Sequence, residues 1–187
     1  MAFIINQETG AVISYCEAED IRSTDQRVFE ANEFDLSGVP DSPATVDDYV
    51  EDLATKATAR INEKIRASHQ WVQYLHHQGQ AIDPNDIPEI DPTLILKRKQ
   101  DFTDMCASYT LKEYILPSIA DFGNPESSEV QKIKYHETRF TDILTELLQI
   151  LDWYDFDSSG TITDQEKQIR TVRRRRTRGQ SSVVRVR

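Results

Sequence analysis

Residues 155–166 carry oxygen-bearing side chains at a spacing that suits the binding of a hard divalent cation. Calcium takes six to eight oxygen ligands at about 2.3–2.6 Å, so a short loop must supply carboxylates, hydroxyls and a carbonyl close together. Gly160, in the middle of the loop, permits the sharp turn with a positive φ that wraps the chain around an ion. The predicted ligands, at loop positions 1, 3, 5, 7, 9 and 12, are Asp155, Asp157, Ser159, Thr161, Thr163 and Glu166.

This spacing matches the twelve-residue calcium loop of EF-hand proteins at each diagnostic position. In that match Thr161 binds through its carbonyl, Thr163 directly or through water, and Glu166 through both carboxylate oxygens. Polar and basic residues follow the loop, where an EF-hand would have an apolar helix face. The sequence also holds no second calcium loop to pair with this one. We therefore predict an isolated structural calcium site rather than a sensor. The alternative is an acidic turn whose side chains only cap helix ends. The apolar residues that predict an incoming helix are Leu147, Ile150, Leu151 and Tyr154.

The formal net charge of −10 combines two regions of opposite sign. All 32 acidic residues lie in residues 1–166 beside 13 basic ones, which gives that region a charge of −19. Residues 167–187 hold Lys167, eight arginines and no acidic residue, for a charge of +9. We therefore expect an acidic body that repels nucleic acid and a basic segment attracted to phosphates, carboxylates or an acidic partner.

The basic segment combines a run of arginines with a short alternating pattern. Four consecutive arginines, 173–176, are typical of a nuclear localisation or nucleic-acid patch, or of a solvated, disordered run. Residues 183–187 favour a strand, which needs the edge of a sheet, and we expect a partner subunit to supply that edge. The residues expected to bind a partner are Arg170, Arg173, Arg174, Arg175, Arg176, Arg178, Val183, Val184, Arg185, Val186 and Arg187.

Apolar spacing predicts an all-α fold, a helical bundle of about four to five helices. Residues 3–15 show a weak hairpin pattern, within an extended N-terminal arm that needs a surface to lie on. The prolines of residues 82–92 predict an extended loop, and Pro117 is expected to kink or end a helix. The predicted helices span residues 17–34, 46–68, 69–78, 93–120 and 127–154.

These patterns divide the chain into four parts. The predicted parts are an N-terminal arm at 1–16, a helical body at 17–154, the calcium loop at 155–166, and a basic C-terminal arm at 167–187 that ends in a short strand.

Enzyme chemistry has little support in the sequence. The four histidines show no metal-ligand spacing, and there is no glycine-rich phosphate loop or nucleophile elbow. Cys16 and Cys106 stand 90 positions apart, which indicates neither a disulfide framework nor a metal site. No apolar run approaches the roughly 20 residues of a membrane span, and no secretory signal is visible. We expect a non-enzymatic protein in a reduced cytosolic setting, without a membrane partner.

Several stretches of the predicted helices resemble the head–tail connector, or adaptor, proteins of tailed bacteriophages. They are residues 25–33, residues 46–68 followed by Trp71, and residues 97–102 and 109–114. The resemblance covers about residues 17–155 and rests on pattern rather than on a signature motif. It implies a small helical protein that forms a ring, often twelve-fold, below the capsid portal and extends the DNA channel.

From this resemblance we expect a structural protein of the virion neck, assembled in the host cytoplasm. Its partners are other copies of the chain, the portal protein, a downstream neck or tail protein, and DNA that passes without sequence-specific contacts. The C-terminal arm would dock on the portal, and the calcium loop would be an addition to the family pattern. Two alternatives stay open: a small EF-hand-type calcium-binding regulatory protein, and a nucleic-acid binder that uses the arginine arm.

Overall fold

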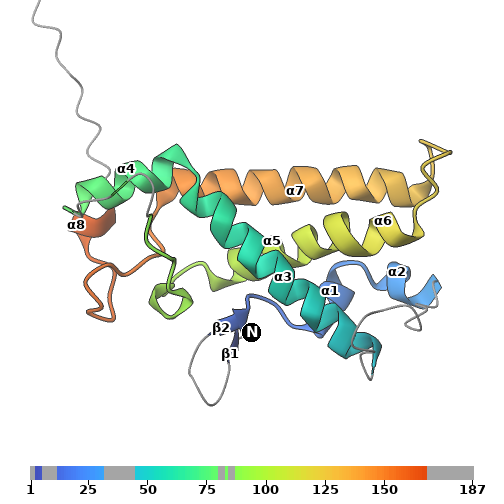
Figure 1. Cartoon of the computed structure of the whole chain (residues 1–187), viewed down its shortest axis with the longest axis horizontal. Helices are drawn as coiled ribbons and strands as arrows, with labels where there is room; N and C mark the ends of the chain where they lie inside the picture. Colours follow the sequence, from blue (N-terminus) through green and yellow to red (C-terminus); the bar gives the residue numbers. More distant parts are fainter. Residues whose placement is uncertain (1–2, 6–11, 32–44, 80–82, 84–86, 168–187) are drawn as a thin grey trace, which may run out of the picture.

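The computed structural model describes residues 3–5, 12–31, 45–79, 83 and 87–167, and most of these are helical. This helical content confirms the predicted all-α class. In chain order (Figure 1) the elements are β1 (Ile4–Ile5), β2 (Val12–Ser14), α1 (Ala18–Thr24), α2 (Gln26–Ala31), α3 (Val46–Arg66), α4 (His69–His77), α5 (Lys99–Thr110), α6 (Leu116–Ile119), α7 (Ser128–Ile150) and α8 (Asp164–Lys167).

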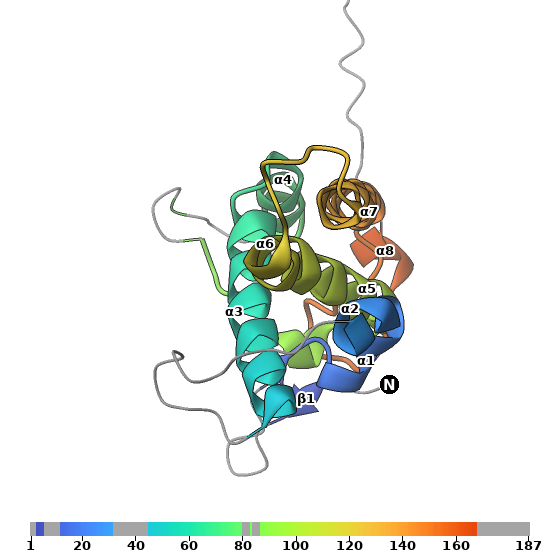
Figure 2. The same ribbon diagram turned by 90° about the vertical axis from the view of Figure 1, so that its right-hand side faces the viewer.

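Helix α5 is the central element, and it packs against α1, α3 and α7. Figures 1 and 2 show α3 crossing one side of α5 while α7 runs along another. The core between them is rich in aromatic side chains. The largest side chains that are almost fully buried include Trp71, Trp153, Tyr15, Tyr74 and Phe102.

No helix in the described ranges combines the length and the apolar character needed to cross a bilayer.

Helices α3 and α4 begin where the sequence predicts because each has a strong N-terminal cap. The Thr45 hydroxyl accepts the N–H of Asp48 at 3.1 Å, and the Asp48 carboxylate accepts the N–H of Thr45 at 3.0 Å. At the start of α4, the Ser68 hydroxyl accepts the N–H of Trp71 at 3.2 Å. This cap fixes Trp71 in the first turn of α4, where its side chain is buried.

The predicted helix over residues 17–34 is interrupted at Asp25, which separates α1 from α2. The Asp25 backbone leaves the helical region, at φ −145° and ψ 76°. Its carboxylate accepts a hydrogen bond of 2.8 Å from Lys132 of α7. The break therefore places a carboxylate against α7, a contact that local apolar spacing does not reveal.

The predicted helix over residues 93–120 is wrong in its first six residues, because α5 starts at Lys99. Pro92–Leu94 form one 3-10 turn, and the chain after it is extended beside a distant segment. The N–H of Asp155 donates to the carbonyl of Leu94 at 2.9 Å, and the N–H of Leu96 donates to the carbonyl of Trp153 at 3.0 Å. Long-range pairing replaces the local helix here.

Helix α5 continues through a π-helical segment, Leu111–Ile115, into α6. Pro117, which has no N–H to donate, is the second residue after the π-helical segment, and the helix ends two residues later at Ile119. Pro117 was predicted to kink or end this helix; the helix runs past it for two residues and ends at Ile119.

The described part of the predicted N-terminal arm places several of its side chains in the core. Strands β1 and β2 pair antiparallel, with Ile4 opposite Ser14, which confirms the hairpin pattern. The ring centroid of Tyr15 lies 4.9 Å from that of Phe3 and 5.1 Å from that of Phe102 on α5. The surface that this hairpin needs is supplied by α5 and α3, and Phe3, Tyr15 and Cys16 are buried in the same core as these helices.

Candidate metal centre

Helix α7 ends at Ile150, so the predicted helix over residues 127–154 is wrong in its last four residues. Leu151 adopts a left-handed conformation with φ 46°, and its N–H donates to the carbonyl of Leu147 at 3.1 Å. Residues 152–155 then run beside residues 94–96, where Tyr154 and Ile95 form an antiparallel bridge. Leu151 and Tyr154 are buried, but not on the face of an incoming helix as predicted.

Trp153 holds this segment in place immediately before the loop. Its indole N–H donates to the carbonyl of Leu147 at 2.9 Å. Its ring stacks on that of Trp71, with the centroids 5.4 Å apart and the planes 7° from parallel. The ring of Phe102 meets it edge-on at 5.0 Å. Helices α4, α5 and α7 therefore fix the residue two positions before the first predicted ligand.

Phe156, the second residue of the loop, extends this aromatic cluster. Its ring centroid lies 4.7 Å from those of Tyr74 and Tyr154, and 5.7 Å from that of Trp71. Aromatic pairs at these distances add about 0.5–1.5 kcal/mol each beyond the area that they bury. The start of the loop is thus packed firmly against α4.

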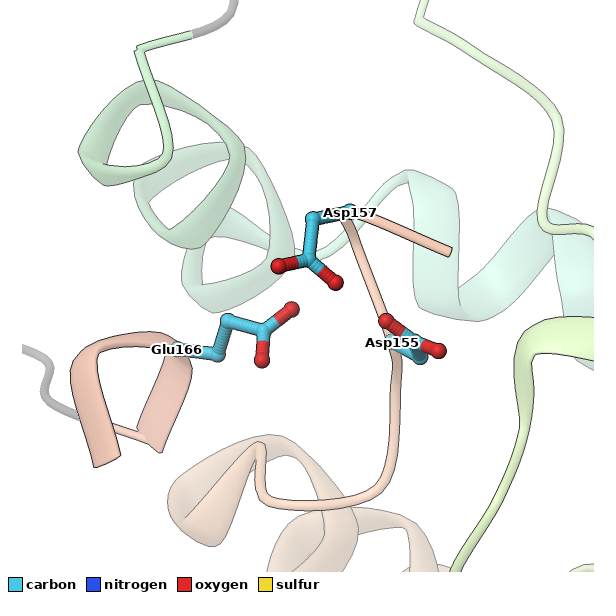
Figure 3. A group of neighbouring side chains, drawn as sticks. All are labelled: Asp155, Asp157 and Glu166. Carbon is cyan, nitrogen blue, oxygen red and sulfur yellow. The ribbon is translucent and has the colours of Figure 1, made fainter. Parts of the chain in front are cut away.

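Three of the predicted ligands converge in space. Ligand oxygens of Asp155, Asp157 and Glu166 all lie within 4.8 Å of one another. Figure 3 shows the three carboxylates turned toward a common space, Glu166 from α8 and the two aspartates from the preceding segment. Asp155 is 1% exposed and Glu166 4% exposed, whereas Asp157 is open to solvent. Three carboxylates this close repel one another unless cations or hydrogen-bond donors compensate them.

Main-chain amides inside the loop partly compensate these charges. The N–H of Gly160 donates to Asp155 at 2.7 Å, and the N–H of Ser159 donates to Asp157 at 2.9 Å. The two oxygens of Glu166 accept from the N–H of Phe156 at 2.9 Å and from the N–H of Thr163 at 2.6 Å. Glu166 therefore ties the first turn of the loop to the last.

These bonds also govern the protonation of the carboxyl groups. Burial raises the pKa of Glu166, but the amide and hydroxyl donors of Thr163 and the amide of Phe156 outweigh it, so the pKa lies below its ordinary value. The pKa of Asp157 is lowered chiefly by hydrogen bonds from Ser159. Both groups are therefore ionised at neutral pH, as cation ligands must be.

The loop turns through two residues with positive φ. Gly160 has φ 79° and Ser158 has φ 55°. Nothing lies within 4 Å of the position that a Cβ atom would take on Gly160, so only backbone conformation favours glycine there. The predicted role of Gly160 as the turning residue is confirmed.

The remaining predicted ligands take part in bonds within the loop. The Ser159 hydroxyl donates to the carbonyl of Thr161 at 2.9 Å, and the Thr163 hydroxyl donates to Glu166 at 2.9 Å. All three residues line the same short turn as the carboxylates. Convergence on one point is established for the three carboxylates, and ligation by Ser159, Thr161 and Thr163 stays a prediction.

The flanking helices differ from those of an EF-hand. Helix α7 stops five residues before Asp155, and α8 starts inside the loop at Asp164. The side chain of Gln78, just after α4, donates to the main-chain carbonyl of Glu166 at 3.3 Å. The entry side of the loop is therefore held by α4 and the aromatic cluster rather than by an incoming helix.

The aromatic support was missed by reasoning from sequence. Trp153, Tyr154 and Phe156 surround the first aspartate, and this density of aromatic residues was the available signal. Their main partners on α4, Trp71 and Tyr74, lie some 80 positions earlier, so spacing alone does not link them. The arginines and valines predicted to bind a partner, Arg170 to Arg187, lie outside the described residues.

Comparisons with protein-family models, with curated proteins and with solved structures find no match to this chain.

Proposed function

We propose that the chain is a non-enzymatic structural protein of a tailed-phage neck, whose helical body contains a structural calcium site. The observation that carries the calcium part is the convergence of the Asp155, Asp157 and Glu166 carboxylates within 4.8 Å. Their all-oxygen chemistry suits a hard cation, and the number of nearby hydroxyl and carbonyl oxygens favours calcium, which takes more ligands than magnesium.

A structural role for the ion follows from where the loop is anchored. Glu166 bonds to the amide of Phe156, and Phe156 packs on α4, so a cation held by Glu166 and Asp155 would fasten the chain after α7 to α4. The alternative of a calcium sensor is less well supported. A sensor uses calcium to change the angle between two flanking helices, whereas α7 ends five residues before Asp155, so no helix leads directly into this loop.

The proposed connector role rests on the charges, the helical fold and the family resemblance together. Residues 1–166 carry a charge of −19 and residues 167–187 a charge of +9. In this proposal the acidic part faces the passing DNA and the basic part faces an acidic partner. An acidic channel wall lets DNA slide because it offers the phosphates no cations to bind. In this proposal copies of the chain form a ring, which is often twelve-fold in the head–tail connector family that the chain resembles. Residues 167–187 dock on the portal.

Isothermal titration calorimetry of the full chain with calcium tests the metal site. We expect one calcium ion per chain and no binding by Glu166→Gln. Asp164→Asn is the matched control, because Asp164 lies in the loop but outside the predicted ligand set. Absence of calcium binding at millimolar calcium, the weak end of the range for such loops, would contradict the proposal.

Truncation tests the docking role. Particles assembled without residues 168–187 should fail to attach the protein to portals, and attachment that persists would count against this role. A nucleic-acid binder would instead show an affinity that falls steeply with salt and disappears on the same truncation.

A further inference from the structure

The fold brings together the two cysteines of the chain, a pairing that their separation of 90 positions does not indicate. Cys16 follows strand β2 and Cys106 lies within α5, and both are free thiols that are fully buried. The Thr103 hydroxyl donates to the carbonyl of Tyr15 at 2.9 Å, which holds the chain just before Cys16 against α5. Cys106 lies one turn after Thr103 on the same face of the helix. The thiol of Cys16 donates a hydrogen bond to the sulfur of Cys106.

Hydroxyl groups surround this pair of thiols inside the core. The Thr58 hydroxyl lies 3.5 Å from the sulfur of Cys106, and the Ser14 hydroxyl lies 3.4 Å from that of Thr58. Burial raises the pKa of the Cys106 thiol, but the hydrogen bonds from Cys16 and these hydroxyls outweigh it, so the pKa lies below its ordinary value. The bond to Cys106 and burial raise the pKa of Cys16. Cys106 is therefore the sulfur that ionises first, and the thiolate is the reactive form of cysteine.

We propose that hydrogen peroxide converts Cys16 and Cys106 into an intramolecular disulfide, which fastens the N-terminal hairpin to α5. The thiolate sulfur of Cys106 attacks one oxygen, the O–O bond breaks, and the leaving hydroxide takes up the thiol proton as water. The sulfur of Cys16 then attacks the resulting sulfenic acid. The S–S bond forms, the S–O bond breaks, and the hydroxyl leaves with the proton of Cys16 as a second water. The two thiols thus lose two electrons, and one peroxide becomes two waters.

Burial determines when this reaction occurs. Both sulfurs are enclosed, so even a small oxidant must wait for a local opening of the fold. The hairpin is the element that we expect to open, because its strands have two and three residues and a two-stranded hairpin is marginally stable alone. In a reducing cytosol the pair stays as thiols, and the bond forms once the protein meets peroxide. The disulfide then prevents further opening at this point.

Peptide mapping of the full chain after treatment with millimolar hydrogen peroxide tests the disulfide. The chain is purified with a reductant, freed of it, oxidised, denatured and alkylated. We expect a linked pair of peptides that contain Cys16 and Cys106, with neither cysteine alkylated, and recovery of both thiols with dithiothreitol. Cys16→Ser is the matched control. Its sulfenic acid on Cys106 has no thiol to react with, so dimedone should label that residue in the variant and not in the oxidised wild-type chain.

The same bond should stabilise the fold. A disulfide that joins residues 90 positions apart restricts the unfolded chain. In urea unfolding followed by tryptophan fluorescence, oxidation should therefore lower the unfolding equilibrium constant by at least about tenfold. Dithiothreitol should reverse this change.

Three results would overturn the proposal. If both cysteines remain open to alkylation, peroxide does not join them. If sulfinic acids or disulfide-linked dimers form instead, the two sulfurs do not meet within one chain. An intramolecular disulfide that leaves the unfolding equilibrium unchanged would contradict the fastening of the hairpin. The proposal depends on neither calcium nor the portal, so its failure is distinguishable from failure of the proposed function.

Discussion

The indole N–H of Trp153 donates a 2.9 Å hydrogen bond to the main-chain carbonyl of Leu147, in the last turn of α7. The same carbonyl accepts the N–H of Leu151, where the chain turns with a positive φ. Two donors thus satisfy one carbonyl at the end of the helix. This arrangement ends α7 and directs Asp155 toward its place beside residue 94.

We expect Trp153→Phe to lower the free energy of unfolding by about 1–3 kcal/mol, because it removes a buried hydrogen bond while keeping an aromatic ring. Trp71→Phe is the matched control. Trp71 is equally buried and stacks on Trp153, but its indole N–H has no acceptor among the described residues. Urea unfolding should therefore show a smaller loss for Trp71→Phe, and equal losses would contradict the role given to the bond.

Substitution of Gly160 should separate backbone conformation from packing. Alanine at φ 79° should cost about 1–2 kcal/mol of stability, since an L-residue disfavours the left-handed region and no neighbouring atom adds a clash. Asparagine tolerates this region better, so Gly160→Asn should be milder. Thermal unfolding at fixed calcium measures both, and a milder effect for alanine than for asparagine would be inconsistent with this explanation.

Buried His136 predicts a loss of stability in mild acid. Burial lowers its pKa and outweighs the attraction of Asp25, whose carboxylate lies 3.9 Å from its Nε2. Unfolding therefore increases proton binding, so this group destabilises the fold as pH falls below the ordinary histidine value of about 6.5. His136→Gln should flatten the pH dependence of unfolding between pH 7 and 5. A pH dependence that stays as steep in His136→Gln would contradict this explanation.

Glu166 predicts a second, more acidic transition. Its pKa is lowered in the folded chain, so its stabilising effect is complete above the ordinary glutamate value of about 4.3 and is lost as pH falls through the lower, folded value. Without calcium, Glu166→Gln should remove part of the acid-induced loss of stability below pH 4.3. An unchanged acid profile, measured by circular dichroism, would mean that its bonds to Phe156 and Thr163 contribute little.

Local patterns predicted the features that depend on neighbouring residues. Thr45 and Asp48 cap α3 from three positions apart, and the loop carboxylates fall within twelve residues, so spacing was sufficient for both. The errors occurred where long-range contacts decide. Leu94 pairs with the N–H of Asp155, some 60 positions away, and this contact replaces a helix.

Burial was also misread at the end of α7. Leu151 and Tyr154 were expected on the face of an incoming helix, whereas both follow the end of α7, and Tyr154 packs against Trp71. Spacing alone cannot distinguish these two ways of burying a short apolar run.

The most direct test of the connector proposal is the mass of the complex formed with the portal protein encoded in the same genome. Native mass spectrometry of the full chain, the portal and calcium should give a portal ring carrying several copies of this chain, each with one calcium ion. Glu166→Gln should lose the calcium from each copy. A chain that stays monomeric and free of the portal at micromolar concentrations would contradict the account.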